Sequence, residues 1–254
     1  MSSTSPSIVR VALLGYGRMG RAIDALAASH QCDVVARLDA ADVLADALSP
    51  ARLGHADVAI DFTVPHAAVP NATACLDAGV PVVIGTTGWL DAIPTLEAAV
   101  KRTGGRALWS PNFSLGVQLT LALMERAGRL FRHAPGFDAH LVETHHTAKL
   151  DAPSGTAIAL RERAEAGLGR SIPVTSVRVG SVPGTHELLL DAPFESITIR
   201  HEARDRRVFA DGALVAARWL ATSPRSGLYT MRDVLGLSSV ASDDATSTSS
   251  VSAS

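Results

Sequence analysis

Residues 8–28 read Ile-Val-Arg-Val-Ala-Leu-Leu-Gly-Tyr-Gly-Arg-Met-Gly-Arg-Ala-Ile-Asp-Ala-Leu-Ala-Ala. A short apolar run ends directly in the pattern Gly15-x-Gly17-x-x-Gly20, and a run of helical character follows. The first glycine permits a tight turn, the second lets a pyrophosphate approach the backbone, and the third lets the helix pack on the strand. In the alternative interpretation the glycines merely serve turns. Strand, glycine turn and helix in this order favour a dinucleotide-binding unit.

A second apolar run, residues 34–38, ends at Asp39. This is close to the distance at which a carboxylate accepts the hydroxyls of the adenosine ribose. A carboxylate there repels a 2′-phosphate, and Ala40 and Ala41 offer no cation, so we predict a preference for NADH over NADPH. Arg37 leaves this preference open, because its side chain could turn towards a phosphate.

Two further apolar runs, residues 58–63 and 80–84, alternate with helical stretches at 67–76 and 89–101. Continuous apolar strands separated by helices are typical of a parallel, doubly wound sheet. Such sheets bind ligands at the carboxyl ends of their strands. The residues expected to line the cofactor cleft at these ends, although each alone is equally compatible with a turn, are Thr63, Gly85, Thr86 and Thr87.

The alternation of strands and helices ends after a further strand at residues 107–109. A long apolar helix is predicted over 115–131, with Ser114 as its cap. From residue 137 onward the sequence is rich in strand patterns, interrupted by one helix, and it returns to helix over 207–222. We therefore predict a hinge near Ser114 and a second domain of α+β type with a mixed or antiparallel sheet.

The stretch Glu143-Thr-His-His-Thr-Ala-Lys-Leu-Asp-Ala-Pro-Ser-Gly-Thr156 places two imidazoles, an ammonium and a helix start in one strand-loop-helix passage. Alternation along the strand puts His145 and His146 on opposite faces. Ser154, Gly155 and Thr156 open the helix, and free backbone N–H groups in a first turn bind anions. With Lys149 nearby, this site suits a carboxylate, and a histidine beside it can donate a proton at pH 7.

A purely structural interpretation is open for each of these residues taken singly. The histidines suit a strand, Lys149 suits solvent, and Ser154 suits an ordinary helix cap. Polar clusters at strand ends in α/β chains usually serve a site, so the combination of these residues in this order favours an active site.

The 254 residues and 47% apolar side chains suffice for one large or two modest domains with substantial cores. A formal net charge of -2 without a block rich in lysine or arginine argues against a nucleic-acid partner. Cys32 and Cys75 lack metal-ligand spacing, so we expect buried thiols, no disulfide and no metal. Without a signal-peptide pattern or a bilayer-length apolar run, we expect a cytoplasmic protein without membrane contact.

Several longer motifs are spread over nearly the whole chain. They are Gly-Tyr-Gly-Arg-Met-Gly at 15–20, Asp-Phe-Thr at 61–63, Gly-Thr-Thr-Gly at 85–88, Asn-Phe-Ser at 112–114, the stretch 143–156, Val-Pro-Gly-Thr-His at 182–186 and Gly-Leu-Tyr-Thr-Met-Arg-Asp-Val-Leu at 227–235. Together they resemble the 4-hydroxy-tetrahydrodipicolinate (dihydrodipicolinate) reductases of lysine and diaminopimelate synthesis. The run His-His-x-x-Lys-x-Asp-Ala-Pro-Ser-Gly-Thr is the most specific of them.

The resemblance implies roles for individual residues. It implies that His145 is the proton donor or acceptor, that Lys149 is a second proton donor, and that His146 binds substrate together with Gly155 and Thr156. The positions that match the nicotinamide-cofactor residues of the family, for NADH or NADPH, are Gly15, Tyr16, Gly17, Arg18, Met19, Asp39, Gly85, Thr86, Thr87, Ser110, Pro111, Asn112 and Phe113.

The resemblance also implies a domain plan. A Rossmann-like domain at residues 1–113 is completed by about residues 219–240, and a substrate and oligomerisation domain at 114–218 assembles a homotetramer through its sheets. Residues 241–254, rich in serine and threonine, are expected to be a disordered tail. Family members often carry arginine directly after the acid at position 39, where this chain has Ala40, and this departure agrees with NADH.

The substrate that the resemblance implies is a cyclic imine dicarboxylate. Hydride from the cofactor would add to a conjugated ring carbon, and the resulting enamine would take a proton from His145. Two alternatives stay open at this point. One is another nicotinamide oxidoreductase, acting on amino acids or sugars, which should not need an anion site beside paired histidines. The other is a dinucleotide-sensing protein without turnover, against which the proton-transfer residues at 145–149 weigh.

Overall fold

The computed structural model describes residues 7–39 and 48–237. The chain divides into two compact units, Met1–Phe113 with Ala210–Ser254 and Ser114–Phe209. The tail predicted at 241–254 and the side chains of Ala40 and Ala41 lie outside the described residues. Each unit has its own sheet, and the predicted combination of an α/β part with an α+β part is confirmed.

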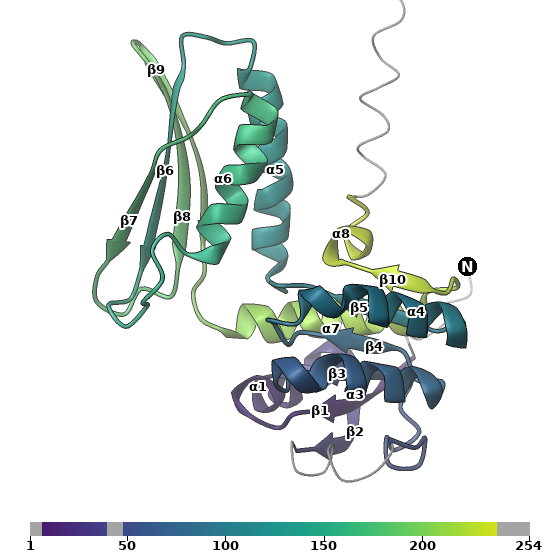
Figure 1. The fold of residues 1–254 in the computed structure, drawn as a ribbon. Helices are drawn as coiled ribbons and strands as arrows, with labels where there is room; N and C mark the ends of the chain where they lie inside the picture. The colour runs from purple at the N-terminus through teal and green to yellow at the C-terminus, as the bar shows by residue number, and fades with distance from the viewer. Residues whose placement is uncertain (1–6, 40–47, 238–254) are drawn as a thin grey trace, which may run out of the picture. The chain divides into compact units, whose positions relative to one another are not determined.

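The first unit contains a six-stranded sheet in which every neighbouring pair is parallel (Figure 1). The strand order is β10-β5-β4-β3-β1-β2. The strands are β1 (Val9–Leu14), β2 (Cys32–Leu38), β3 (Val58–Asp61), β4 (Val82–Ile84), β5 (Arg106–Trp109) and β10 (Gly227–Tyr229). The apolar side chains of β1, β3 and β4 are buried on both faces, as expected for the interior strands of a parallel sheet between helices.

The order of these strands reverses at β1. The chain passes from β1 to β2 on one side, and then returns to add β3, β4 and β5 on the other side of β1. A doubly wound sheet binds its ligand where this reversal occurs, outside the carboxyl ends of the strands. The glycine turn after β1 and Thr63 after β3 flank that point.

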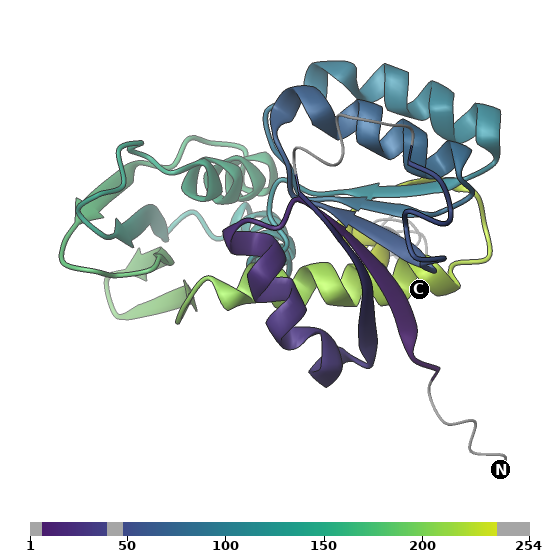
Figure 2. The ribbon, with the colours of Figure 1, turned by 90° about the horizontal axis from the view of Figure 1, so that it is seen from below.

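Helices cover both faces of this sheet. In Figure 2, α3 and α4 lie on one face, and α1 and α7 lie on the other. The helical elements of the first unit are α1 (Arg18–Ala27), η1 (Ala28–His30), α3 (Pro65–Asp77), η2 (Leu90–Ala92), α4 (Ile93–Thr103), α7 (Arg207–Thr222), whose first turn belongs to the second unit, and α8 (Met231–Val234). The helices predicted over 67–76, 89–101 and 207–222 are therefore present, the second interrupted at its start by η2.

The second unit contains a mixed four-stranded sheet in the order β7-β6-β8-β9. Its strands are β6 (Asp138–His145), β7 (Val174–Arg178), β8 (Thr185–Ala192) and β9 (Glu195–Glu202). The pair β6 and β7 is parallel, whereas the other two pairs are antiparallel. Along β6 the residues alternate between buried and part-exposed, and Leu141, Glu143 and His145 are on the buried face. The predicted alternation is confirmed.

Two helices pack side by side on one face of this sheet: α5 (Leu115–Phe131) and α6 (Gly155–Leu168) (Figure 1). Glycine permits their close approach, because a Cβ on Gly128 would lie 2.3 Å from the carbonyl oxygen of Ala164. Serine caps both helices as predicted: the Oγ of Ser114 accepts from Val117 N at 3.3 Å, and the Oγ of Ser154 accepts from Ala157 N at 3.2 Å.

Among the described residues, no helix combines the length and the apolar character that a membrane crossing requires.

Candidate active site

The three glycines after β1 have different surroundings. Gly15 has φ +89°, its N–H donates to Leu38 O at 2.7 Å, and a Cβ there would lie 2.4 Å from Phe62 O. A Cβ on Gly20 would lie 2.3 Å from Gly15 O. A Cβ on Gly17 would meet nothing within 4 Å. The outer glycines are therefore needed by the protein itself, whereas Gly17 leaves open space at the start of α1.

A buried carboxylate joins the ends of β3 and β4. Asp61 is fully buried, and its Oδ1 accepts from the hydroxyls of Thr63 at 2.9 Å and Thr86 at 2.7 Å, while its Oδ2 accepts from Asn71 at 2.8 Å. Burial raises the pKa of Asp61, and the hydrogen bonds from Asn71, Thr86 and Thr63 oppose this. Asp61 therefore orients two of the predicted cofactor residues rather than contacting a ligand itself.

The remaining predicted cofactor residues follow β4 and β5, whose parallel pairing puts their carboxyl ends at one edge of the sheet. Gly85 lies against Phe62, whose ring a Cβ would overlap at 2.1 Å. Ser110 Oγ donates to Asn112 O at 2.6 Å and shapes the turn after β5. Thr87 and Pro111 are exposed at this edge, and Phe113 is buried.

Arg37 on β2 is held by a side chain on α1. Its Nε and Nη2 donate to the two carboxylate oxygens of Asp24, each at 2.7 Å, and its Nη1 donates to Val34 O at 3.0 Å. The hydroxyl of Tyr16, in the glycine turn, donates to the same carboxylate at 2.5 Å. Arg37 thus has a defined partner on its own unit, while Asp39 is exposed just beyond the end of β2.

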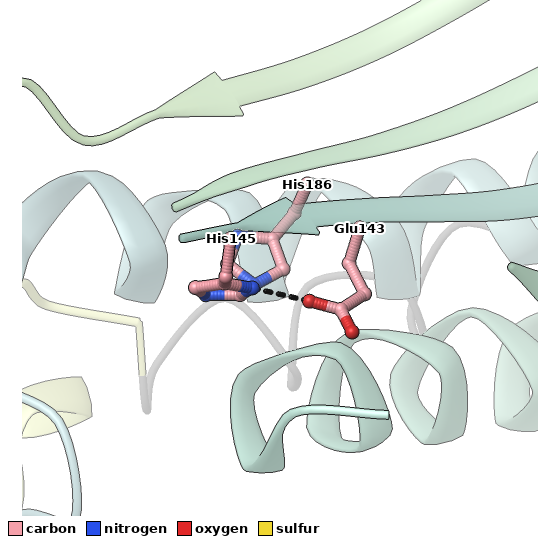
Figure 3. Close-up of side chains that lie close together, drawn as sticks. All are labelled: Glu143, His145 and His186. Carbon is pink, nitrogen blue, oxygen red and sulfur yellow. Dashed lines mark hydrogen bonds and ion pairs between the residues drawn. The ribbon is translucent and has the colours of Figure 1, made fainter. Parts of the chain in front are cut away.

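The candidate proton donor lies in the second unit, where β6 meets β7 and β8. Figure 3 shows Glu143, His145 and His186 gathered together, with a dashed line from His145 to Glu143. His145 Nδ1 is hydrogen-bonded to Glu143 Oε2, and Arg178 Nη2 donates to Glu143 Oε1 at 2.7 Å. Burial alone would raise the pKa of Glu143, but the bonds from Arg178 and His145 hold it below its usual value, so Glu143 is a carboxylate.

The pKa of His145 is lowered. Burial is the main cause, and the positive charges of Lys149 and Arg178 add to it, whereas the bond and charge of Glu143 act in the opposite direction. The other ring nitrogen, Nε2, lies beside Gly184, where a Cβ would come within 3.0 Å of it. Because Gly184 has no side chain, it leaves Nε2, the ring nitrogen that does not bond to Glu143, uncovered on this side.

The loop after β6 brings Lys149 to a carboxylate of the chain. Lys149 Nζ lies 2.8 Å from Asp151 Oδ1, and this contact is the largest of the influences that lower the pKa of Asp151. The backbone N–H of Gly155, at the start of α6, contributes to the same lowering. The ammonium and the helix start thus converge on one carboxylate group, which is the class of ligand that the sequence predicted for them.

The other predicted substrate residues surround this loop. Ser154 is buried and uses its Oγ to cap α6, 3.4 Å from His186 Nε2. Gly155 is exposed, and a Cβ there would meet nothing within 4 Å. Thr156 follows in the first turn of α6, and His146 is part-exposed directly after β6. His145 and His146 diverge in burial as predicted from alternation.

Three side chains here could in principle share a metal ion. Each of Glu143, His145 and His186 offers one ligand atom, and the three atoms lie within 4.8 Å of one another. However, both oxygens of Glu143 already bind His145 and Arg178, and a guanidinium beside a cation site is unfavourable. We therefore interpret Glu143 and His145 as a hydrogen-bonded pair on which the ring of His186 packs, with the two imidazole centroids 5.2 Å apart, and not as a set of metal ligands.

Burial lowers the pKa of His186 to about 4, and the neighbouring His145 and His201 add to this. A histidine whose folded-state pKa is below its unfolded value binds fewer protons in the native state, so its contribution to stability is present above pH 6.5 and is lost as pH falls towards 4. We expect the free energy of unfolding to drop by about 2 kcal/mol from this residue between pH 7.5 and pH 5.

Urea unfolding at both pH values measures this change. In His186→Gln the drop should be smaller than in the wild type by about that amount. The exposed His133 provides the matched control, since His133→Gln should reproduce the wild-type drop. Equal drops in all three proteins would contradict the assignment to His186.

Sequence reasoning gave no role to several residues of these clusters, among them Arg178, His186, Asp61 and Asp24. Each bonds to a residue from another part of its unit: Arg178 to Glu143 on β6, His186 to Ser154 before α6, Asp61 to Thr86 after β4, and Asp24 to Arg37 on β2. The available signals were weak: Asp61 and His186 occur inside quoted motifs, and a charge in an apolar strand generally needs a partner. No signal in the sequence says which partner that is.

Two protein-family models together match almost all of the residues that the structure describes. "Dihydrodipicolinate reductase, N-terminus" matches residues 9–113, and "Dihydrodipicolinate reductase, C-terminus" matches residues 116–235. Among solved structures, a dipicolinate-bound dihydrodipicolinate reductase from Paenisporosarcina sp. TG-14 superposes with a TM-score of 0.74 at 23% identity, over 88% of this chain and 97% of that chain. An amine dehydrogenase from Mycobacterium smegmatis superposes with a TM-score of 0.56 at 12% identity, over 87% of this chain and 94% of that chain. At this identity the likeness shows a shared fold alone.

Curated relatives agree with these matches. A 4-hydroxy-tetrahydrodipicolinate reductase from Christiangramia forsetii is 36% identical over 239 residues, which cover 89% of this chain and 98% of that protein. The 4-hydroxy-tetrahydrodipicolinate reductase from Thiobacillus denitrificans is 37% identical over 269 residues, which cover 90% of this chain and 99% of that protein. Reductases of this family use NADH or NADPH. The chain therefore belongs to the dihydrodipicolinate reductase family, with 4-hydroxy-tetrahydrodipicolinate reductase activity in lysine biosynthesis.

Proposed function

We propose that the two units divide the work of this reductase: the first binds NADH, and the second binds the cyclic imine dicarboxylate and supplies the proton. The observation that carries the proposal is the cluster in the second unit. There Arg178 bonds to Glu143, the partner of His145, and to the loop carbonyls of Lys149 and Asp151. The Asp151 carboxylate in turn accepts from Lys149 and from the N–H of Gly155 at the start of α6.

In this mechanism one substrate carboxylate takes the place that the Asp151 carboxylate now has. Lys149 and the N–H group of Gly155 would bind it, because both already donate to the Asp151 carboxylate and Gly155 has no side chain to cover them. The N–H group of Thr156, next in the first turn of α6, would be a further donor. Ser154 supports the site by capping the helix, and His146 lies at the edge of the same loop.

The chemical steps follow from charge balance. The nicotinamide cofactor, when bound by the first unit, would supply a hydride ion to the conjugated ring carbon that is present once the 4-hydroxyl group has left as water. The electron pair would then move onto the substrate ring and give a deprotonated enamine. The enamine carbon then takes the proton from Nε2 of protonated His145, whose N–H bond electrons remain on the imidazole. Lys149 stabilises negative charge on the substrate and is a second proton source. Loss of NADH absorbance with enzymatically generated 4-hydroxy-tetrahydrodipicolinate tests turnover directly.

Lys149→Ala should raise the KM for the substrate by about tenfold, the size of one charge-assisted hydrogen bond to a carboxylate. The KM for NADH should change by less than about twofold, because the cofactor residues belong to the other unit. Lys101, in the last turn of α4, is the matched control, and Lys101→Ala should leave both constants unchanged. Steady-state kinetics with each ligand varied in turn measure the effect, and an unchanged substrate KM would rule out this role for Lys149.

For the cofactor we propose a preference for NADH. Asp39 is exposed after β2, and Arg37 is held by Asp24 and so does not offer a ready cation to a 2′-phosphate. We expect the KM for NADH to be lower than that for NADPH by about tenfold or more, the scale of a charge placed beside a phosphate. Asp24→Asn should reduce the difference between the two KM values, because Arg37 would no longer be held by Asp24 and could contact the 2′-phosphate of NADPH. A wild-type enzyme that favours NADPH would contradict the proposal.

We further propose that the chain forms a homotetramer through the sheet of the second unit. The face of this sheet that α5 and α6 do not cover carries exposed apolar side chains, among them Val177 and Leu189. Exposed apolar patches of this kind favour association between copies of a chain. The cytoplasm is the location that we propose for the enzyme.

A further inference from the structure

Glu143 is a buried charge to which the mechanism above gives no function. It is fully buried on β6, and taking a carboxylate out of water is unfavourable unless it is paired and hydrogen-bonded. A structural strand position in this core would be occupied more favourably by an apolar residue such as the neighbouring Leu141. The presence of the carboxylate therefore calls for a function that needs its charge.

We propose that Glu143 is a positioning residue for His145, and that Arg178 couples this pair to the loop that carries Lys149. The inference rests on the proposed role of His145 in proton transfer. It assigns to Glu143 no contact with substrate or cofactor.

The first part of the argument concerns which ring nitrogen carries the transferable proton. Because Glu143 is a carboxylate, it can only accept, so Nδ1 of His145 is the donor in their hydrogen bond. The proton that is exchanged must then be the one on Nε2. That nitrogen lies next to Gly184, which has no side chain to cover it. The ring is thereby held in one orientation with one active nitrogen.

The second part concerns charge. Of the groups that surround His145, Lys149 from the loop and Arg178 from β7 are cations, and His186 from β8 is an uncharged imidazole at neutral pH. Glu143 is the one group in this set that favours the imidazolium. A carboxylate that accepts from the imidazole stabilises the protonated ring. Without that charge, a smaller fraction of His145 would be protonated at pH 7.

The third part concerns Arg178. Its Nη2 donates to Glu143 at 2.7 Å and to Asp151 O at 2.5 Å, and its Nε donates to Lys149 O at 3.3 Å. A planar guanidinium presents its donors in a fixed geometry, so these acceptors are held in a fixed relation. Arg178 consequently holds both Glu143, which orients His145, and the loop that carries Lys149.

The test uses the full-length enzyme and Glu143→Gln, which keeps the shape of the side chain and removes its charge. The pKa of the His145 ring, followed by NMR on the histidine-labelled protein, should fall by about one unit. Because a general acid loses activity above its pKa, the basic limb of the kcat profile should move to lower pH by a similar amount. We expect kcat at pH 7 to fall roughly tenfold or more, with both KM values within about twofold.

Controls separate this role from a structural one. Asp138, also on β6, forms an exposed ion pair with Arg170, and Asp138→Asn should leave the pH profile unchanged. If Glu143 acts through His145, the double variant Glu143→Gln with His145→Gln should be no slower than His145→Gln alone. A normal rate in His145→Gln would refute the role of His145 in proton transfer, not the role of Glu143. The pKa of His145 measured by NMR tests Glu143 separately, because it does not depend on turnover.

An unchanged or raised pKa of His145 in Glu143→Gln would overturn the inference, as would additive losses in the double variant. Should the glutamine variant fail to fold, Glu143→Asp takes its place. Its shorter carboxylate reaches Nδ1 less well, so the basic limb should move in the same direction by a smaller amount. A basic limb that stays at the wild-type position in the aspartate variant would also overturn it.

Discussion

Replacement of His145 by glutamine is expected to lower kcat about a hundredfold or more, the usual scale for the loss of a general acid. Glutamine retains an amide that can donate to Glu143, but its amide cannot release a proton to a carbon near neutral pH. Hydride transfer alone would leave the enamine unprotonated. The dissociation constant for NADH should stay within about twofold of the wild type, because His145 belongs to the second unit and the cofactor residues to the first.

The measurement combines the rate of NADH oxidation at saturating substrate with a separate titration of NADH binding. His140 is the matched control: it is on the same strand, on the opposite face, and bonds to Thr175 Oγ1 at 2.8 Å. His140→Gln should keep its turnover. Turnover close to the wild-type rate in His145→Gln would remove this residue from the proton-transfer step.

Gly17→Ala is expected to weaken NADH binding by roughly tenfold to a hundredfold, the range for losing charge-assisted contacts to a phosphate. The structure leaves the space next to Gly17 open, and its φ of −79° suits alanine, so the protein has no need of its own for glycine at this position. An added methyl group would stand where the pyrophosphate must approach the first turn of α1. The thermal midpoint should therefore remain close to that of the wild type.

Gly20→Ala provides the contrast. Its Cβ would come within 2.3 Å of Gly15 O, so α1 must shift from β1, and we expect a loss of about 1–3 kcal/mol in stability from overpacking. Measured NADH affinity and thermal midpoint together distinguish the two glycines. An equal loss of thermal stability in both variants would show that Gly17 serves packing and not the cofactor.

Parts of the site could be predicted from sequence because they depend on a few neighbouring residues. Ser154 is a cap because its hydroxyl reaches an N–H three residues ahead, and Glu143 shares a face with His145 because side chains alternate along a strand. The glycine turn likewise follows from local geometry at Gly15. The family resemblance rested on the same local motifs, and the comparisons confirm it.

Other parts could not be predicted because strand register decides them. The parallel register of β6 and β7 places Arg178 beside His145, and the antiparallel register of β6 and β8 places His186 opposite Glu143. A shift of one residue in either register would turn these side chains to the other face of the sheet. The pKa values of Glu143, His145 and His186 depend on that pairing, so they too are properties of the assembled sheet.

By itself, the sequence determined the doubly wound first unit, the family, and the residue types available for proton transfer and anion binding, because periodicity, turn chemistry and capping act over a few residues. Only the tertiary structure decided that Asp24 holds Arg37, that Asp61 joins Thr63 to Thr86, and that Arg178 joins Glu143 to the Lys149 loop. The physical reason is that a buried or paired charge is stable only beside its partner, and long-range packing alone brings the partner there.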